Sequence, residues 1–306
     1  MVCFGCTTAP HLNFPTVDGV GVELTQTPFF PQQTNECGPA ALATVLGASG
    51  VDVTPEDLVQ ETYLPARKGS LQLELIAAAR RQHRVAYVLA TQPQALIDEL
   101  DARHPVLVLQ DLGLGPLHAW HYAVVIGYEP QRREVVLRSG TTQRLIVAYD
   151  DFLRTWRGGA FWALVVLRGE TLPATADPAR YVDAIVPLEA LGDTKTARAA
   201  YATALARWPD NVVALFGLAN TEHKLGQLSA AEQAYRRLLA LTPDNPIVLN
   251  NLAEVLLDRG CAADALKYAD AALERISAGG DVEAAVRDTR ARAATGVRER
   301  DSKACD

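Results

Sequence analysis

Hydrophobic and polar positions follow different periods in successive parts of the chain. From residue 39 to 101, apolar residues recur at helical spacing, as Leu71, Leu75 and Ala79 do, which predicts helices. From 105 to 167, short apolar runs alternate with turn residues, which predicts strands. The expected strands cover residues 105–110, 121–128, 134–139, 144–148 and 161–167, and one earlier strand is expected at residues 84–89, between two of the helices. Helices that cluster early and strands that cluster late indicate an α+β domain over residues 25–168.

Local signals mark where three of the expected helices begin. Cys37 ends a polar loop, and the Ala/Leu-rich pattern that follows has Pro39 in its first turn. Thr54-Pro55-Glu56-Asp57 resembles a capping box with proline at the first helical position. Ser70 is predicted to cap the helix that carries Leu75.

After a linker at residues 169–177, the chain repeats with a period of 34 residues. Four position types recur in register: Gly192, Gly226 and Gly260; Ala197, Ala231 and Ala265; Tyr201 and Tyr235; Pro209 and Pro243. Small residues at helix crossings, an aromatic knob and a closing proline at this period form the tetratricopeptide (TPR) pattern. We therefore predict an all-α TPR solenoid with a capping helix that ends near residue 300. Its repeats are residues 178–211, 212–245 and 246–279.

Composition narrows the class of protein. The chain has 306 residues, 49% hydrophobic and 21% charged, which describes a globular protein of two domains. Its net charge of −7 argues against a nucleic-acid-binding surface. No apolar run approaches the ~20 residues of a membrane span. The cysteines have neither metal-ligand spacing nor a disulfide framework, so no metal or cofactor is expected. They are Cys3, Cys6, Cys37, Cys261 and Cys305.

Cys37 is the candidate nucleophile. Unpaired backbone N–H groups and the positive end of the helix dipole favour a thiolate at a helix start, and such a setting lowers the pKa of a thiol. The competing interpretation is a buried cysteine that packs as a small hydrophobe.

His121 is the candidate base, because it opens the apolar run His-Tyr-Ala-Val-Val-Ile-Gly-Tyr. A nucleophile at an early helix start and a base at a later strand start, adjacent only in space, is the papain-type layout. The alternative is a hydrogen-bonded structural histidine. His118, in the Gly/Pro-rich loop just before, is the main rival base.

These residues carry a family resemblance. Gln32, four intervening residues, then Cys37-Gly-Pro-Ala-Ala-Leu, followed far downstream by His121-Tyr-Ala-Val-Val-Ile-Gly-Tyr, resembles the bacteriocin-processing (double-glycine leader) branch of papain-like cysteine peptidases. The resemblance implies Cys37 as nucleophile, His121 as base and a glutamine before the cysteine in the oxyanion hole. Gln32 fits that spacing, and Gln33 competes with it. The resemblance also implies cleavage after small residues such as a Gly-Gly pair.

The resemblance further implies a third catalytic member, an Asp usually followed by Pro on the next strand, and this chain has no such pair. If the hairpin turns near residues 130–131, antiparallel pairing puts His121 opposite about Gly140. Ser139 and Gly140 then occupy the place of the Asp. Ser139 Oγ or a nearby backbone carbonyl can orient the imidazole without formal charge, so we expect slower turnover than in an intact triad.

The N-terminal arm, residues 1–24, has two interpretations. Gly5-Cys6 followed by small residues resembles the processing site of a bacterial lipoprotein, but a signal peptide needs an apolar stretch of about 7–15 residues before it. Cys6 is then either the lipidated residue of a truncated signal, on the periplasmic side of the cell envelope, or part of a disordered arm of a cytoplasmic protein.

Two further groups of residues are candidates for binding. Trp120, beside His121, either forms the substrate rim or packs as a rim aromatic. The first helices of the repeats line the concave face that usually binds a peptide or partner protein. Their polar candidates are Asn220, His223, Lys224, Asn250, Asn251 and Glu254, which are equally explained as solvated positions.

Two functional hypotheses follow. The first is a cysteine peptidase whose repeats recruit a protein substrate or partner. The second is an inactive papain-like module that acts with the repeats as an assembly scaffold. Transglutaminase-like or acyltransferase-like use of the same Cys–His pair is a third hypothesis.

Overall fold

The computed structural model describes residues 20–32, 36–113, 116–276 and 280–299. The chain forms two compact units. The N-terminal unit comprises the described residues up to 82 together with 86–167 and 173–175, and the C-terminal unit comprises 83–85, 168–172 and the described residues from 176 onward.

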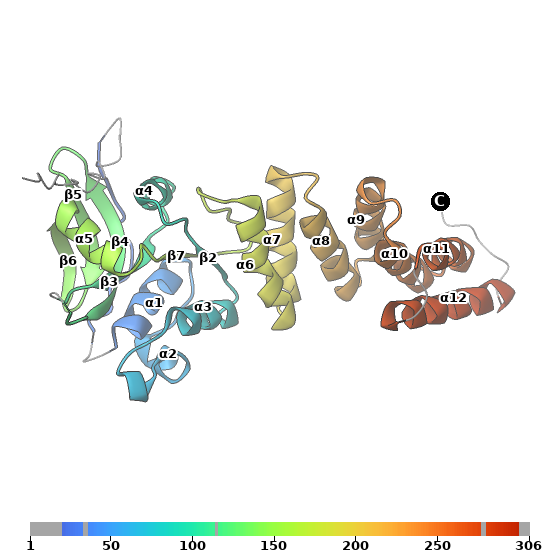
Figure 1. Ribbon diagram of the computed structural model, residues 1–306, viewed down its shortest axis with the longest axis horizontal. Coiled ribbons are helices and arrows are strands. Elements are labelled where there is room, and N and C mark those ends of the chain that lie inside the picture. Colours follow the sequence, from blue (N-terminus) through green and yellow to red (C-terminus); the bar gives the residue numbers. More distant parts are fainter. Residues whose placement is uncertain (1–19, 33–35, 114–115, 277–279, 300–306) are drawn as a thin grey trace, which may run out of the picture. The chain divides into compact units, whose positions relative to one another are not determined.

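The N-terminal unit is built on one sheet with the strand order β2-β7-β3-β4-β5-β6, and β1 pairs with β4 (Figure 1). The registers of β3, β4, β5 and β6 are antiparallel. The strands are β1 (Val22–Glu23), β2 (Val85–Val88), β3 (Val106–Asp111), β4 (Trp120–Glu129), β5 (Glu134–Ser139), β6 (Thr142–Ala148) and β7 (Ala163–Leu167). The mixed α and β composition predicted for this part of the chain is confirmed.

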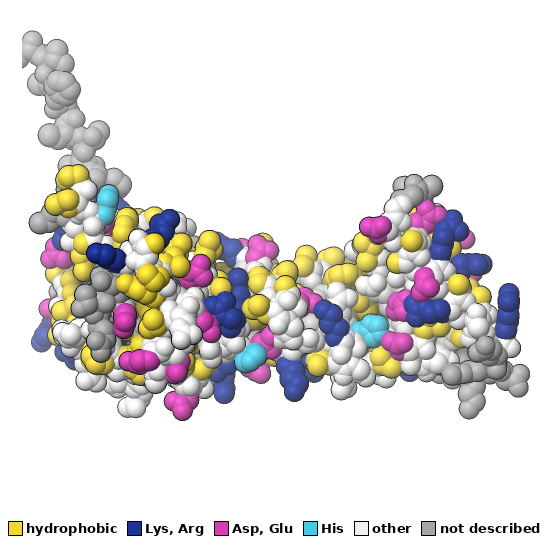
Figure 2. Space-filling model, turned by 90° about the horizontal axis from the view of Figure 1, so that it is seen from below, with side chains coloured by type: hydrophobic (Ala, Val, Ile, Leu, Met, Phe, Trp, Pro, Cys, Tyr) yellow, Lys and Arg dark blue, Asp and Glu magenta, His cyan; other side chains and the backbone are white. Residues whose placement is uncertain are grey.

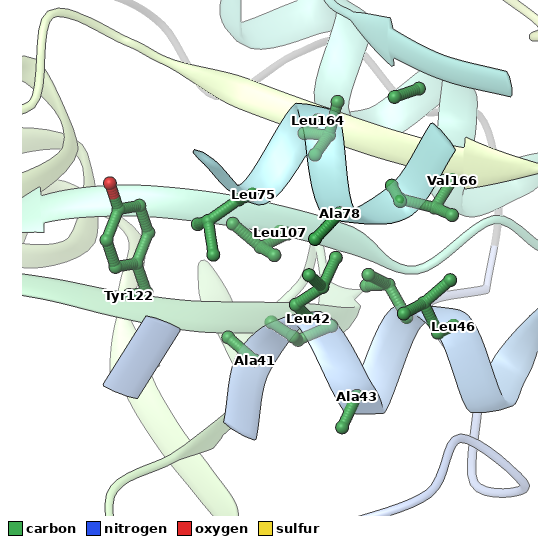
Figure 3. Close-up of a cluster of buried hydrophobic side chains, with 14 of the residues drawn as sticks. Ala41, Leu42, Ala43, Leu46, Leu75, Ala78, Leu107, Tyr122, Leu164 and Val166 are labelled. Carbon is green, nitrogen blue, oxygen red and sulfur yellow. The ribbon is translucent and has the colours of Figure 1, made fainter. Parts of the chain in front are cut away.

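Helices pack on both faces of this sheet. They are α1 (Cys37–Ala48), α2 (Pro55–Thr62), α3 (Gln72–Arg81), α4 (Pro93–Asp101) and α5 (Tyr149–Gly158), with a 3₁₀ helix η1 (Pro65–Arg67). On one face, Leu42 and Leu46 of α1 and Leu75 of α3 form a core with alternate residues of β3 and β4 (Figure 3). On the other, Thr155 of α5 accepts a hydrogen bond from Gln110.

Local chemistry explains where these helices begin. Thr54 caps α2 by accepting a hydrogen bond from the backbone N–H of Asp57, and the Asp57 carboxylate accepts one from the backbone N–H of Thr54, as the capping-box pattern predicts. The prediction for Ser70 is wrong. Leu71 is the N-cap of α3, and Ser70 Oγ is buried without a hydrogen-bond partner in the described part of the chain.

The C-terminal unit is a row of helices in which each packs on the next. They are α6 (Pro178–Ala190), α7 (Thr194–Arg207), α8 (Val212–Lys224), α9 (Leu228–Leu241), α10 (Pro246–Asp258), α11 (Ala262–Arg275) and α12 (Asp281–Glu299). The recurrent residues have the positions that the 34-residue period predicts. Gly192, Gly226 and Gly260 lie after α6, α8 and α10 at φ of 77°, 72° and 84°, where a residue with a Cβ is strained. Ala197, Ala231 and Ala265 are fully buried.

One cysteine prediction is wrong. Cys261 is disulfide-bonded, whereas its spacing from the other cysteines suggested no disulfide framework. Spacing is uninformative here because disulfide geometry depends on three-dimensional proximity. Cys3, Cys6 and Cys305 lie outside the described residues, as does the predicted lipid-attachment site.

Candidate functional site

Cys37 is the first residue of α1, and its thiol is free and half-buried. Burial raises the pKa of this thiol above its ordinary value. Hydrogen bonds from the backbone N–H groups of Tyr122, Gly38 and Cys37 itself act in the opposite direction and are outweighed. The expectation of a lowered pKa is therefore wrong, because desolvation of the thiolate exceeds the stabilisation available at the helix start.

The backbone of Tyr122 is available to Cys37 because β5 leaves β4 early. The pairing of β4 with β5 has its last partners at Val124 and Arg138, so it does not extend to Tyr122. Gln32 uses the same stretch, since its Nε2 donates to the Tyr122 carbonyl oxygen at 3.4 Å. Gln32 and Cys37 thus meet at one residue of β4.

Gln32 is also held by its own backbone, whose N–H donates to Gly140 O at 3.1 Å. A side-chain amide has two N–H donors, so one remains for a substrate oxygen. Gln33, the competing oxyanion candidate, lies outside the described residues.

His121 is half-buried, and its Nε2 is hydrogen-bonded to Ser139 Oγ at 2.8 Å. Burial lowers the pKa of this imidazole. The predicted backbone pairing of His121 with Gly140 is absent from the β4–β5 register, because β5 ends at Ser139 and turns into β6 through Gly140 at φ 60°. This turn contacts two candidate residues at once: Ser139 binds the His121 ring, and Gly140 binds the backbone of Gln32.

No hydrogen bond joins the described side chains of Cys37 and His121. They are connected through β4, where His121 directly precedes the residue whose N–H binds the Cys37 sulfur. The structure therefore brings Cys37, Gln32, His121 and Ser139 to one end of β4, where the pKa of the thiol is raised and the pKa of the imidazole is lowered by burial.

A cleft of about 510 Å³ opens beside Cys37. Trp120, the substrate-rim candidate, lines it and is 54% exposed. The other lining residues are Arg67, Lys68, Gly69, Ser70, Leu71, Gln72, Leu109 and Tyr122.

The rival base His118 has a carboxylate partner that sequence reasoning missed. His118 Nδ1 lies 2.5 Å from Asp111 Oδ2, and the His118 ring stacks on Trp120 with ring centroids 5.2 Å apart. The hydrogen bond with His118, followed by those from the backbone N–H groups of Ala119 and Gly113, lowers the pKa of Asp111 to about 2. The available signal was an acidic residue directly after the buried run 105–110 and two residues before a glycine.

The candidate residues of the repeats are mostly engaged within the stack. Asn220 accepts a hydrogen bond from Tyr235, and Asn251 donates to the same hydroxyl at 3.3 Å. His223 pairs with Asp258 at 2.7 Å, and Lys224 lies 3.9 Å from Glu189. Glu254 accepts from Thr289 and pairs with Arg292, whereas Asn250 Oδ1 is buried without a partner in the described residues.

Other classes of site are not evident in the described residues. They contain no group of three His, Cys, Asp or Glu side chains that could hold a metal ion. None of the described helices is both long and apolar enough to span a membrane. On the face seen in Figure 2, cationic and anionic side chains are interspersed.

Comparison with known families assigns both parts of the chain. Residues 24–157 match the family described as Peptidase_C39 like family, and residues 188–246 and 224–281 match the tetratricopeptide repeat. The chain thus consists of a C39-like peptidase-family domain followed by tetratricopeptide repeats. The resemblance inferred from the Cys37 and His121 motifs is confirmed at this level.

Solved structures with similar parts include peptidases and TPR proteins. A C39-like peptidase from Bacillus anthracis is 16% identical, covers 48% of this chain and 98% of its own, and has a TM-score of 0.41. The peptidase domain of Streptococcus ComA, a bi-functional ABC transporter involved in a quorum sensing pathway, is 22% identical over 46% and 98%, with a TM-score of 0.38. The Sgt2 TPR domain from Aspergillus fumigatus is 17% identical over 42% and 86%, with a TM-score of 0.37. No curated protein matches the chain.

Proposed function

We propose that the N-terminal unit is a cysteine peptidase that uses Cys37 as nucleophile and His121 as general base. The observation that carries the proposal is that Cys37 and Gln32 both bind the backbone of Tyr122. The residue before Tyr122 is His121, which is hydrogen-bonded to Ser139. These are the parts that acyl transfer by a thiol requires: a nucleophile, a base, a group that orients the base and a donor for the oxyanion.

In the proposed acylation step, the Cys37 thiol transfers its proton to His121 as the sulfur attacks the peptide carbonyl carbon. For His121 to accept at Nδ1, its Nε2 must carry the proton that is donated to Ser139 Oγ. The free N–H of the Gln32 amide stabilises the oxyanion. The C–N bond then breaks, the imidazolium protonates the leaving amine, and a thioester remains on Cys37.

In the deacylation step, a water molecule loses its proton to His121 and attacks the thioester. The C–S bond breaks, the proton returns to the sulfur, and the new carboxylic acid leaves. The pKa shifts of Cys37 and His121 both favour the neutral pair, so acylation needs a proton transfer that an ion-paired site has already made. We therefore expect turnover slower than that of a peptidase with a thiolate–imidazolium pair and a carboxylate.

We also propose that the repeats recruit the protein substrate or a partner of the peptidase. Tetratricopeptide repeats are extended stacks whose concave surfaces bind other chains. Because five of the six predicted polar residues contact other side chains of the stack, the backbone and the remaining exposed positions would provide most of this surface.

The alternative is an inactive module that acts with the repeats as a scaffold. The raised pKa of the Cys37 thiol and the absence of a carboxylate on His121 among the described residues favour it. Retention of Gln32, Cys37 and His121 around one backbone segment favours the peptidase, because a scaffold has no chemical need for these groups to converge.

Incubation with a peptide mixture that contains Gly-Gly sequences, followed by mass spectrometry, distinguishes the peptidase hypothesis from the scaffold hypothesis. A peptidase gives new termini that disappear in Cys37→Ala and His121→Ala. Identical peptide profiles for the wild type and both variants would leave the scaffold as the function.

A further inference from the structure

The cleft beside Cys37 carries charge of one sign. Arg67 and Lys68 line it, and no carboxylate is among the described residues of its lining. Both cations are exposed, and neither side chain has an ion-pair or hydrogen-bond partner in the described part of the chain. This differs from Arg81, a cation at the end of α3, which pairs with Glu61 at 2.6 Å.

The backbone holds both cations at the edge of the cleft. Arg67 ends η1, and Lys68 follows at φ 49°, a left-handed conformation that is unfavourable for a residue with a Cβ. Two backbone hydrogen bonds close the turn: Leu64 N–H donates to Gly69 O at 2.8 Å, and Lys68 N–H donates to Pro65 O at 3.2 Å. The backbone that carries the two cations is therefore held in a defined turn.

The rest of the cleft combines the polar side chains of Ser70 and Gln72 with apolar surface. Leu71, Leu109, Trp120 and Tyr122 contribute to its lining. A cation beside apolar surface is a setting in which a carboxylate gains a charge-assisted hydrogen bond, and an arginine fork can bind one through two N–H groups. The net charge of the chain is −7, but a carboxylate that lies farther from the cleft than the screening length of about 8 Å repels an acidic ligand there only weakly.

We infer that the cleft selects peptides with an acidic side chain close to the bond that faces Cys37, and that Arg67 and Lys68 bind its carboxylate. The inference rests on the proposed peptidase function and adds a substrate class to it. The apolar lining accommodates the neighbouring residues of the same peptide.

Binding to full-length Cys37→Ala, which lacks the nucleophile, tests the inference without requiring turnover. Acetylated and amidated Gly/Ala octapeptides, each with one Glu or one Gln at a scanned position, are titrated by calorimetry. We expect Glu to bind about tenfold more tightly than Gln at one or two positions. The added substitutions Arg67→Met and Lys68→Met should remove this preference.

Arg154→Met is the matched control, because Arg154 is an exposed cation of α5 that pairs with Asp151 and does not line the cleft. Equal affinities at every position, no binding of either series, or a preference that survives loss of both cations would overturn the inference. Cleavage by the wild type is measured separately. Preferential binding without cleavage would remove the peptidase proposal and leave acidic-peptide recognition standing.

Discussion

At the scale of single residues, burial rather than the helix start determines the protonation of the candidate site. Desolvation penalises the charged form of either group, so it raises the pKa of the Cys37 thiol and lowers the pKa of the His121 imidazole. Both shifts favour the neutral pair. In the proposed mechanism, proton transfer therefore accompanies attack on the substrate.

These directions predict the pH profile of kcat/KM. The base must be unprotonated, so the acid limb should lie below the ordinary histidine value of 6.5. The thiol must keep its proton until attack, so the alkaline limb should lie above the ordinary thiol value of 9.0. Initial rates measured from pH 4 to 10 check this. A decline centred near pH 8 would instead indicate a preformed thiolate–imidazolium pair.

Ser139→Asp should increase the rate of Cys37 alkylation by iodoacetamide at pH 7 about tenfold. A carboxylate hydrogen-bonded to His121 stabilises the imidazolium, and one unit of pKa shift corresponds to about 1.4 kcal/mol. Ser139→Ala serves as the control and should not accelerate labelling. Equal rates in the wild type and Ser139→Asp would mean that position 139 does not act on the imidazole.

The sequence indicates which residues are candidates for the site, but it does not indicate their pKa shifts. Cys37, His121 and Ser139 follow from motifs and hairpin spacing, which are local features. The pKa of Cys37 depends on how deeply tertiary packing buries the sulfur, and its helix position alone gave the wrong direction. Asp111 was missed because its hydrogen bond with His118, seven residues further on, exists only in the folded chain.

At the scale of elements, the end of the β4–β5 pairing creates the candidate site. The register shifts between Val125 and Gly127, and the pairing of β4 with β5 ends at Val124 and Arg138. A regular hairpin would use the Tyr122 backbone for sheet pairing, whereas here it binds Gln32 and Cys37. Strand alternation predicts the hairpin but does not predict such an irregularity, because the pattern of side chains on the two faces is almost unchanged.

In the repeats, a glycine inside a helix is required by a neighbouring ring. A Cβ built on Gly217 of α8 would lie 2.2 Å from a ring atom of Tyr201, which is fully buried in α7. Helix propensity favours alanine over glycine by up to about 1 kcal/mol. Overpacking costs about 1–3 kcal/mol, so packing dominates.

Gly217→Ala should therefore lower the free energy of unfolding of the repeats by about 1–2 kcal/mol, measured by urea denaturation. Combining it with Tyr201→Ala should destabilise less than the sum of the two changes, because the ring that causes the clash is absent. An unchanged or raised free energy of unfolding in Gly217→Ala would show that the helices separate at little cost.

The repeats were the most predictable part of the chain. Their helix ends are set by local residues that recur every 34 positions, such as Gly192, Gly226 and Gly260 at positive φ. The order of strands in the sheet could not be obtained in this way, since β7 lies between β2 and β3 although it is last in sequence. Such non-local pairing leaves no periodic signal.

At the scale of the whole molecule, the chain joins a C39-like peptidase-family domain to tetratricopeptide repeats. In the sequence, residues 168–172 belong to the second compact unit and residues 173–175 to the first. In the proposed division of labour, the first unit cleaves and the second raises the local concentration of a protein substrate.

Deletion of residues 178–306 should raise KM for a protein substrate while kcat/KM for a short peptide stays unchanged. The short peptide reaches only the cleft, whereas the protein substrate also needs the repeats. Steady-state kinetics on both substrates, with circular dichroism to verify folding, make the comparison. Loss of both activities in the truncated chain would show that the units depend on each other to fold.

Catalysis by the proposed mechanism depends most directly on cooperation between Cys37 and His121. A Gly-Gly chloromethyl ketone alkylates a peptidase thiol that a base activates, and digestion with mass spectrometry locates the adduct. We expect rapid modification of Cys37 in the native protein, and a rate at least tenfold lower in His121→Ala. Equal rates in the two proteins, or no adduct at Cys37, would contradict the proposed mechanism.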